Sequence, residues 1–186
     1  MSTNKNAFEY SLKSVGAFNY LVEPLFKYFQ AENMAYCRVL KNGKRIYLST
    51  SEEWIKLYRD HSFQDDEKHS HWYAPKSDIK YSLWSGFEEN EIISACSSIG
   101  HYHGFSFHDY NREEGYFEYF SLSSTAEDFS FPNRVWKDLS ILHKQIDALK
   151  RNSQFLFDHK NEKKLITPRL FITSEEQVKG DEGKKG

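Results

Sequence analysis

The Asn42-Gly43 pair, set between two apolar runs, is the feature of this chain that most restricts its fold. Both residues tolerate a positive φ, and such a pair favours the two-residue turns that join antiparallel strands. The flanking runs are AYCRVL and RIYLST. The sequence therefore predicts a β-hairpin over residues 35–49.

A second hairpin is predicted further along the chain. Residues 102–110 (YHGFSFHDY) alternate between apolar and polar, residues 111–115 form a turn, and residues 116–124 (YFEYFSLSS) return as a strand. A short strand is expected over 81–84, and a weak one within 155–172. Since the strands come mostly as hairpins, the sheet is expected to be mainly antiparallel.

Helical periodicity accounts for most of the remaining segments. The apolar stripe over 11–30 is interrupted by Pro24, which lacks an N–H, so two short helices are expected to meet near Glu23. Three further helices are expected, at 52–60 (capped by Thr50 or Ser51), at 88–98 and at 133–152. This order of elements predicts an α+β fold, a PAS-like α-β-α sandwich with a mainly antiparallel sheet.

The last of these helices has apolar residues at alternating spacings of four and three. Such a narrow seam packs within one chain more often than it forms a dimer face, although it is compatible with both. The seam consists of Val135, Leu139, Leu142, Ile146 and Leu149.

The length of 186 residues suggests one folded domain with loose ends. We expect a flexible leader over residues 1–10, the domain over 11–172, and a disordered charged tail over 173–186.

Charge and hydropathy exclude several classes of protein. The formal net charge of −2 gives no basic excess for nucleic acid. The chain has no apolar run of the ~18 residues that a membrane helix needs, and no signal peptide at its start. Cys37 and Cys96 form no motif, which favours buried thiols in a reducing cytoplasm. We therefore expect a cytoplasmic protein that contacts neither membrane nor DNA directly.

Metal-ligating residue types gather in the segment that follows the 52–60 helix. His69 and His71 lie near Asp65, Asp66 and Glu67, but no HExxH spacing and no cysteine pair completes a metal site. Solvated loop side chains are the simpler interpretation, so no metal is expected.

Catalytic motifs are likewise missing from the sequence. It has no G-x-S-x-G turn and no glycine-rich phosphate loop. Cys96 falls on the apolar side of its expected helix, which indicates a buried thiol and not a nucleophile. The sequence thus predicts no catalytic residue, no cofactor and no enzyme.

Several segments together resemble the autoinducer-binding domain of LuxR-type transcription regulators. RVLKNGKRIYLSTSEEWIKLY resembles the family's strand and helix with a Trp-x-x-x-Tyr pair, and ISACSSIGHYHGFSFHDYNREEGYFEYFSLSS resembles its helix, glycine turn and paired strands ending in Leu-Ser-Leu-Ser. Trp84 stands where the family has a second Trp. The resemblance covers about residues 14–155.

This resemblance implies an α-β-α sandwich with a ligand cavity. In the family, the first Trp donates a hydrogen bond to the lactone carbonyl of an acyl-homoserine lactone and the Tyr packs on the ligand, which maps to Trp54 and Tyr58. The second Trp, beside the ligand headgroup, maps to Trp84, and a serine that reaches the acyl carbonyl maps to Ser121. Helical spacing alone also allows Trp54 and Tyr58 to be plain core residues.

The chain departs from the family at two polar contacts. The family's Asp-Pro pair, which binds the ligand amide, has no counterpart, and counting places Glu67 or His69 there. A Tyr that often precedes the first Trp by four residues is Thr50 here. A buried amide left unpaired costs about 1–3 kcal/mol, enough to change ligand choice. The expected ligand is therefore an acyl-homoserine lactone or another small apolar signal.

The end of the chain also differs from the family. Residues 165–169 (LITPR) resemble the start of the family's DNA-binding module, but no recognition helix follows. The resemblance implies a ligand-sensing domain without the helix-turn-helix half, acting as a homodimer or paired with a LuxR-type regulator. An interaction module with a collapsed pocket and an unrecognised enzyme remain as alternatives. A cavity of ~300 Å³ beside Trp54 would favour the sensor, and a closed core the interaction module.

Overall fold

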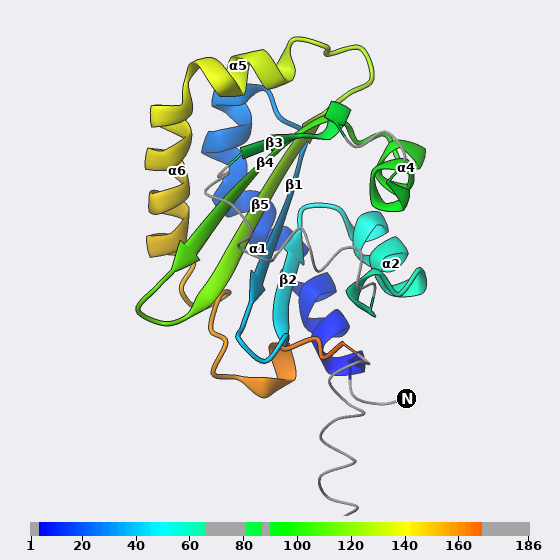
Figure 1. The fold of residues 1–186 in the computed structure, drawn as a ribbon, viewed down its shortest axis with the longest axis vertical. Helices are drawn as coiled ribbons and strands as arrows, with labels where there is room; N and C mark the ends of the chain where they lie inside the picture. The colour runs from blue at the N-terminus through cyan, green and yellow to red at the C-terminus, as the bar shows by residue number, and fades with distance from the viewer. Residues whose placement is uncertain (1–3, 66–80, 87–89, 169–186) are drawn as a thin grey trace, which may run out of the picture.

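An antiparallel sheet between two helical layers forms the body of the molecule (Figure 1). The computed structural model describes residues 4–65, 81–86 and 90–168; Glu67, His69 and the expected 173–186 tail lie outside these ranges. Within these ranges, five strands are ordered β2-β1-β5-β4-β3. They are β1 (Asn33–Val39), β2 (Arg45–Ser49), β3 (Tyr81–Leu83), β4 (Tyr102–Asn111) and β5 (Tyr116–Ser124). Both predicted hairpins belong to this one sheet, which confirms the expected fold class.

The helices divide between the two faces of the sheet (Figure 1). On one face, α5, α6 and the C-terminal part of α1 pack on the larger apolar core. On the other, α2 and α4 cover a second cluster, which the N-terminal part of α1 also reaches. The bounds are α1 (Lys5–Phe29), α2 (Glu52–Asp60), α4 (Glu91–Ser98), α5 (Phe131–Lys137) and α6 (Leu139–Asn152). In the described ranges, no helix is long and apolar enough to cross a membrane.

The start of α1 corrects the expectation of a flexible leader. The helix begins at Lys5, and Ala7 and Phe8 are buried in the second cluster. The Asn4 side chain donates to the Thr167 carbonyl at 2.9 Å and accepts from the Thr167 N–H at 2.7 Å. These contacts with a distant segment hold the first turn in place, which the local sequence could not indicate.

The expected break at Pro24 is also wrong, because α1 runs through it. Pro24 removes the helical hydrogen bond to the carbonyl of Tyr20, but it lies on the exposed side of the helix, where water can satisfy that carbonyl. Val22 and Leu25 on the opposite side stay buried in the core. Tertiary packing therefore holds the helix through the proline.

The expected 133–152 helix is divided at Asp138 into α5 and α6. The Asp138 carboxylate accepts a hydrogen bond from the Tyr28 hydroxyl at 3.2 Å, which ties this turn to α1. The apolar seam packs inward on both sides of the break, so it serves the core and not a dimer face.

In the described part of the weak strand expected within 155–172, residues 155–168, the pairing is reduced to a single bridge. Arg45 and Ile166 exchange both backbone hydrogen bonds, at 2.9 and 2.8 Å. Pro168, two residues on, has no N–H to donate, so pairing along β2 cannot continue in that direction.

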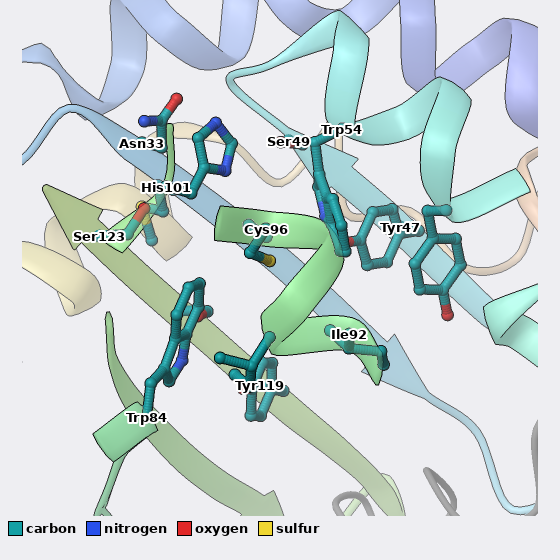
Figure 2. Close-up of a pocket in the computed structure, with 15 residues that line it drawn as sticks. Asn33, Tyr47, Ser49, Trp54, Trp84, Ile92, Cys96, His101, Tyr119 and Ser123 are labelled. Atoms are coloured by element: carbon teal, nitrogen blue, oxygen red, sulfur yellow. The ribbon is translucent and has the colours of Figure 1, made fainter. Parts of the chain in front are cut away.

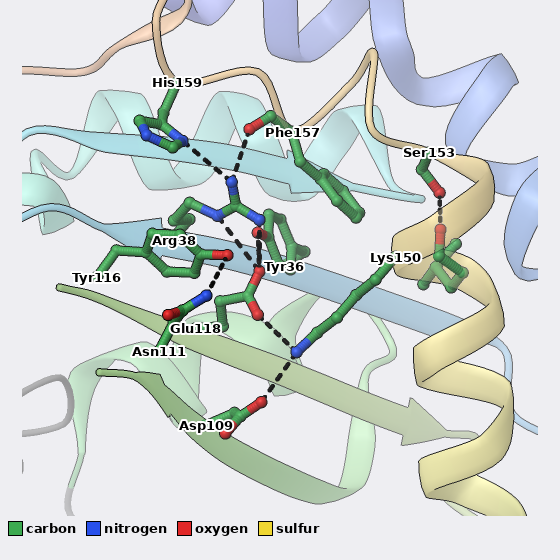
Figure 3. A network of polar contacts seen from close by, with 11 residues as sticks. Tyr36, Arg38, Asp109, Asn111, Tyr116, Glu118, Lys150, Ser153, Phe157 and His159 are labelled. Carbon is green, nitrogen blue, oxygen red and sulfur yellow. Dashed lines mark hydrogen bonds and ion pairs between the residues drawn. The ribbon is translucent and has the colours of Figure 1, made fainter. Parts of the chain in front are cut away.

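A buried charge network ties α6 to the sheet on the larger-core face (Figure 3). The Glu118 carboxylate of β5 accepts from Arg38 of β1 at 2.8 Å and from the Tyr36 hydroxyl at 2.6 Å. Lys150 of α6 reaches Glu118 at 2.6 Å and Asp109 at 2.9 Å. Because Glu118 is 2% exposed, its charge depends on these partners for stability.

Candidate ligand-binding site

A pocket lies between the sheet and the α2–α4 layer, on the face opposite the charge network (Figure 2). Its walls include Trp54 and Tyr58 of α2, Trp84 after β3, and Ser121 of β5. These four predicted ligand contacts come from three separate segments of the chain, and the structure brings them together. Their role in binding a ligand stays a prediction.

The position of Trp54 is set by the start of α2. Ser51 accepts a hydrogen bond from the Trp54 backbone N–H at 3.1 Å, and Glu52 and Glu53 occupy the first turn. A side-chain cap and negative charge at a helix N-terminus are both stabilising. The predicted cap and helix are confirmed, and they direct Trp54 and Tyr58 onto the same wall.

The Trp54 indole N–H is already engaged in this structure. It donates to the hydroxyl of Tyr47, whose ring stacks on that of Tyr58 with centroids 4.2 Å apart. Burial raises the pKa of Tyr47 well above its usual value, so the hydroxyl keeps its proton at neutral pH. Tyr47 was not predicted as a site residue, although its alternation with Ile46 and Leu48 in β2 could have indicated it.

Trp84 forms another wall of the pocket. Its indole N–H donates to the Ser106 hydroxyl at 3.1 Å, and Ser106 also contacts the Tyr119 hydroxyl at 2.7 Å and the Ser121 hydroxyl at 3.3 Å. Strand alternation left open whether Ser121 faces the pocket or solvent. The structure places it in the pocket, 6% exposed.

Thr50 does not line the pocket, contrary to the expectation from the family's Tyr position. Its hydroxyl accepts from the Met34 backbone N–H at 2.9 Å and is thus committed to β1. The polar groups supplied by this region are instead Tyr47 and Ser49. Glu67 and His69 lie outside the described residues, so their predicted contacts stay predictions.

The pocket lining carries no charged side chain in the described part of the chain. Burial raises the pKa of the Cys96 thiol far above its usual range and that of Tyr119 to about 12. It also lowers the pKa of His101 to about 4. At neutral pH all three groups are therefore uncharged, which suits an uncharged ligand better than an ion.

Catalytic and metal-binding arrangements are not found among these residues. Across the described ranges, no three His, Cys, Asp or Glu side chains are placed to hold a metal ion. No described serine or cysteine of the lining is hydrogen-bonded to a histidine, the arrangement that would activate a nucleophile.

The space inside the pocket is limited. Unfilled space amounts to about 610 Å³, part of it open to solvent, but only about 50 Å³ can hold the centre of a water molecule. A cavity of about 50 Å³ holds a few waters. It falls short of the ~300 Å³ expected for an open small-molecule site.

The fold is that of the autoinducer-binding domain of LuxR-type regulators. The structure of SdiA in complex with octanoyl-rac-glycerol matches with a TM-score of 0.54 at 14% identity, over 75% of this chain and 60% of that chain. Escherichia coli SdiA in space group P6522 matches with a TM-score of 0.52 at 13% identity, over 78% and 63%. This chain thus spans less than two thirds of those chains. No protein-family model and no curated protein matches it.

Proposed function

We propose that this chain is a ligand-sensing domain that binds a small, uncharged, largely apolar molecule and is not an enzyme. The observation that carries the proposal is the convergence of Trp54, Tyr58, Trp84 and Ser121 on one buried pocket. The fold is shared with a protein solved in complex with octanoyl-rac-glycerol. Aromatic walls with a few fixed polar groups are typical of small-molecule sites.

A ligand with an acyl chain needs more room than the pocket now offers. The helix most easily displaced to enlarge the pocket is α4, because Cys96 is its only fully buried side chain and Ile92 and Ile93 are only half-buried. Outward movement of α4 would open the pocket without disturbing the sheet. Binding would then be accompanied by a change of shape in this layer.

The small cavity also favours a second candidate. If the aromatic side chains fill the pocket permanently, the domain would act as an interaction module with no ligand of its own. The two candidates differ in whether any apolar molecule enters beside Trp54, which a binding experiment decides.

The experiment is calorimetric titration with 1-octanoylglycerol and, separately, with N-octanoyl-homoserine lactone. Native mass spectrometry of the freshly purified protein would show any molecule that it retains. Saturable binding of either compound, or a retained small molecule, supports the sensor. The interaction module predicts neither.

Two phenylalanine substitutions on β1 give a matched control. Ala35 lines the pocket, so Ala35→Phe should fill it and abolish binding. Val39 lies further along the same face of β1, packs against the same cluster and does not line the pocket, so Val39→Phe should leave binding intact. Equal effects of the two substitutions would argue against this pocket as the site.

We also propose that the domain acts through a homodimer or by pairing with a full-length LuxR-type regulator. The formal net charge of −2 gives it no electrostatic attraction to DNA by itself. Sedimentation analysis with and without ligand tests self-association, and co-purification with a regulator tests pairing. A monomer in all these conditions would contradict this part of the proposal.

A further inference from the structure

Three polar side chains gather at one end of the pocket, apart from the Trp54–Tyr47 wall (Figure 2). Asn33 of β1 and Ser123 of β5 are directly paired across the two strands. His101 precedes β4, whose first residue, Tyr102, pairs with Ser124 of β5. The topology of the sheet thus brings together three side chains from distant parts of the sequence.

Two of these side chains are buried and the third, Asn33, is half-buried. His101 is 7% exposed and Ser123 is 2% exposed. Among the residues that the structure describes, none forms a hydrogen bond with the His101 ring, the Ser123 hydroxyl or the Asn33 amide. Their polar atoms are not fully enclosed by protein, and all three side chains line the pocket. Three such groups facing one cavity can hydrogen-bond a polar group of a ligand that enters it.

Several other polar groups of the pocket are hydrogen-bonded within the fold. Ser121 contacts Ser106 at 3.3 Å, and Ser49 accepts from the Ser51 N–H at 3.1 Å. The Trp54 and Trp84 N–H groups each donate to a hydroxyl. The Asn33–His101–Ser123 end differs from these, because its three side chains keep hydrogen-bonding capacity for a ligand.

The chemistry of this end defines what it can bind. A neutral imidazole, a hydroxyl and an amide each offer both a donor and an acceptor. No lysine, arginine or carboxylate of the described chain lines the pocket to balance an ionic ligand. A hydroxyl group both donates and accepts, so it matches each of the three better than a carboxylate or an ammonium does.

We propose that Asn33, His101 and Ser123 form a polar subsite that binds the hydroxyl groups of an uncharged, hydroxylated apolar ligand. This inference rests on the proposed sensor function and names the chemical class of its ligand. The subsite distinguishes hydroxylated molecules from equally apolar ones without hydroxyls, because only the former can both donate hydrogen bonds to the three side chains and accept them.

The test uses two probes that differ only in hydroxyl groups. They are 1-octanoylglycerol, which carries two hydroxyls beside its ester, and propyl octanoate, which has the same ester and acyl chain and none. Calorimetric titration gives both affinities for the full chain. We expect wild-type protein to bind 1-octanoylglycerol at least about tenfold more tightly, the worth of one or two neutral hydrogen bonds.

Substitutions in the subsite should remove this preference. His101→Leu and Ser123→Ala should each reduce the affinity for 1-octanoylglycerol about three- to tenfold and leave that for propyl octanoate unchanged. His101→Gln retains a donor and an acceptor and should restore part of the preference. His103→Leu is the matched control, because the His103 ring hydrogen-bonds the Ala126 carbonyl and does not line the pocket.

The outcomes separate the two proposals. If both probes bind and the preference is absent, or is unchanged in His101→Leu and Ser123→Ala, the subsite is wrong and the sensor function stands. If neither probe binds to folded wild-type protein, the subsite is wrong; the sensor function fails as well only if N-octanoyl-homoserine lactone does not bind and the purified protein retains no small molecule. Thermal unfolding of each variant shows whether it is folded, and His101→Gln and Ser123→Ala serve if His101→Leu does not fold.

Discussion

The Trp84 indole lies so close to the backbone of Gly104 that a β-carbon on residue 104 would stand 1.9 Å from a ring carbon. No real side chain tolerates that distance. Glycine at 104 is therefore a steric requirement for the Trp84 wall, beyond the general backbone role that glycines have in turns. The same contact brings the indole N–H within reach of Ser106 on the same strand.

We expect Gly104→Ala to displace the Trp84 ring from the pocket wall. The overlap should cost about 1–3 kcal/mol of stability, as overpacking usually does. The tryptophan emission spectrum should shift as Trp84 is displaced, and ligand affinity should fall. Gly16→Ala is the control, because nothing lies within 4 Å of a β-carbon there. Wild-type emission and affinity in Gly104→Ala would contradict the steric argument.

Trp54→Phe should separate the role of the indole N–H in folding from its role in binding. The N–H donates to Tyr47, so its loss should cost about 1 kcal/mol of unfolding free energy. Tyr47→Phe removes the same hydrogen bond from the other side and keeps the indole. If ligand binding uses the N–H, titration should show weaker binding in Trp54→Phe by about 1–2 kcal/mol and not in Tyr47→Phe. Wild-type affinity in Trp54→Phe would mean that the Trp54 N–H takes no part in binding.

The charge network of Figure 3 should be a major contributor to stability. Glu118→Ala leaves the buried Arg38 and the half-buried Lys150 without their shared partner, which should cost about 3–5 kcal/mol. Asp109→Ala is the control, because the Asp109 side chain is 46% exposed and its ion pair with Lys150 is screened by solvent. Urea unfolding measures both variants, and a loss in Glu118→Ala no larger than that in Asp109→Ala would refute this role.

Stability should fall as the pH drops from about 6.5 to about 4. Burial lowers the pKa of His101 from 6.5 to about 4, so in this window the unfolded chain binds a proton that the folded chain excludes. The contribution of His101 to the free energy of unfolding is present in full above pH 6.5 and is lost as the pH falls. Its total is up to about 3 kcal/mol. Arg134 holds the pKa of Asp128 well below its usual value, so the loss from that carboxylate comes at lower pH.

Urea unfolding at pH 7 and pH 4.5 measures this effect. His101→Gln should reduce the difference between the two pH values, because glutamine does not titrate. His103→Gln should leave the difference as it is in the wild type. An unchanged difference in His101→Gln would show that the ring is not buried in its neutral form.

The sequence determined the elements whose signals are local. Asn42-Gly43 fixed the first hairpin, and the Ser51 cap with its two glutamates fixed α2, because these signals act over a few neighbouring residues. The LuxR-like motifs indicated Trp54, Tyr58, Trp84 and Ser121, and the structure brings these together in one pocket. Alternation along β5 placed Ser121 on the other face of the sheet from Phe120 and Leu122, but it did not indicate which face lines the pocket.

Tertiary structure alone decided the features that depend on distant partners. Helix α1 continues through Pro24 because the opposite side of the helix is packed in the core. Thr50 does not line the pocket because its hydroxyl is hydrogen-bonded to the backbone of β1. Tyr47 and His101 became pocket residues only when the order β2-β1-β5-β4-β3 brought their segments to one face. Turn, cap and periodicity signals describe interactions between residues a few positions apart. A pocket is built from strands and helices that are distant in the sequence, and no short stretch of sequence specifies which of them become neighbours.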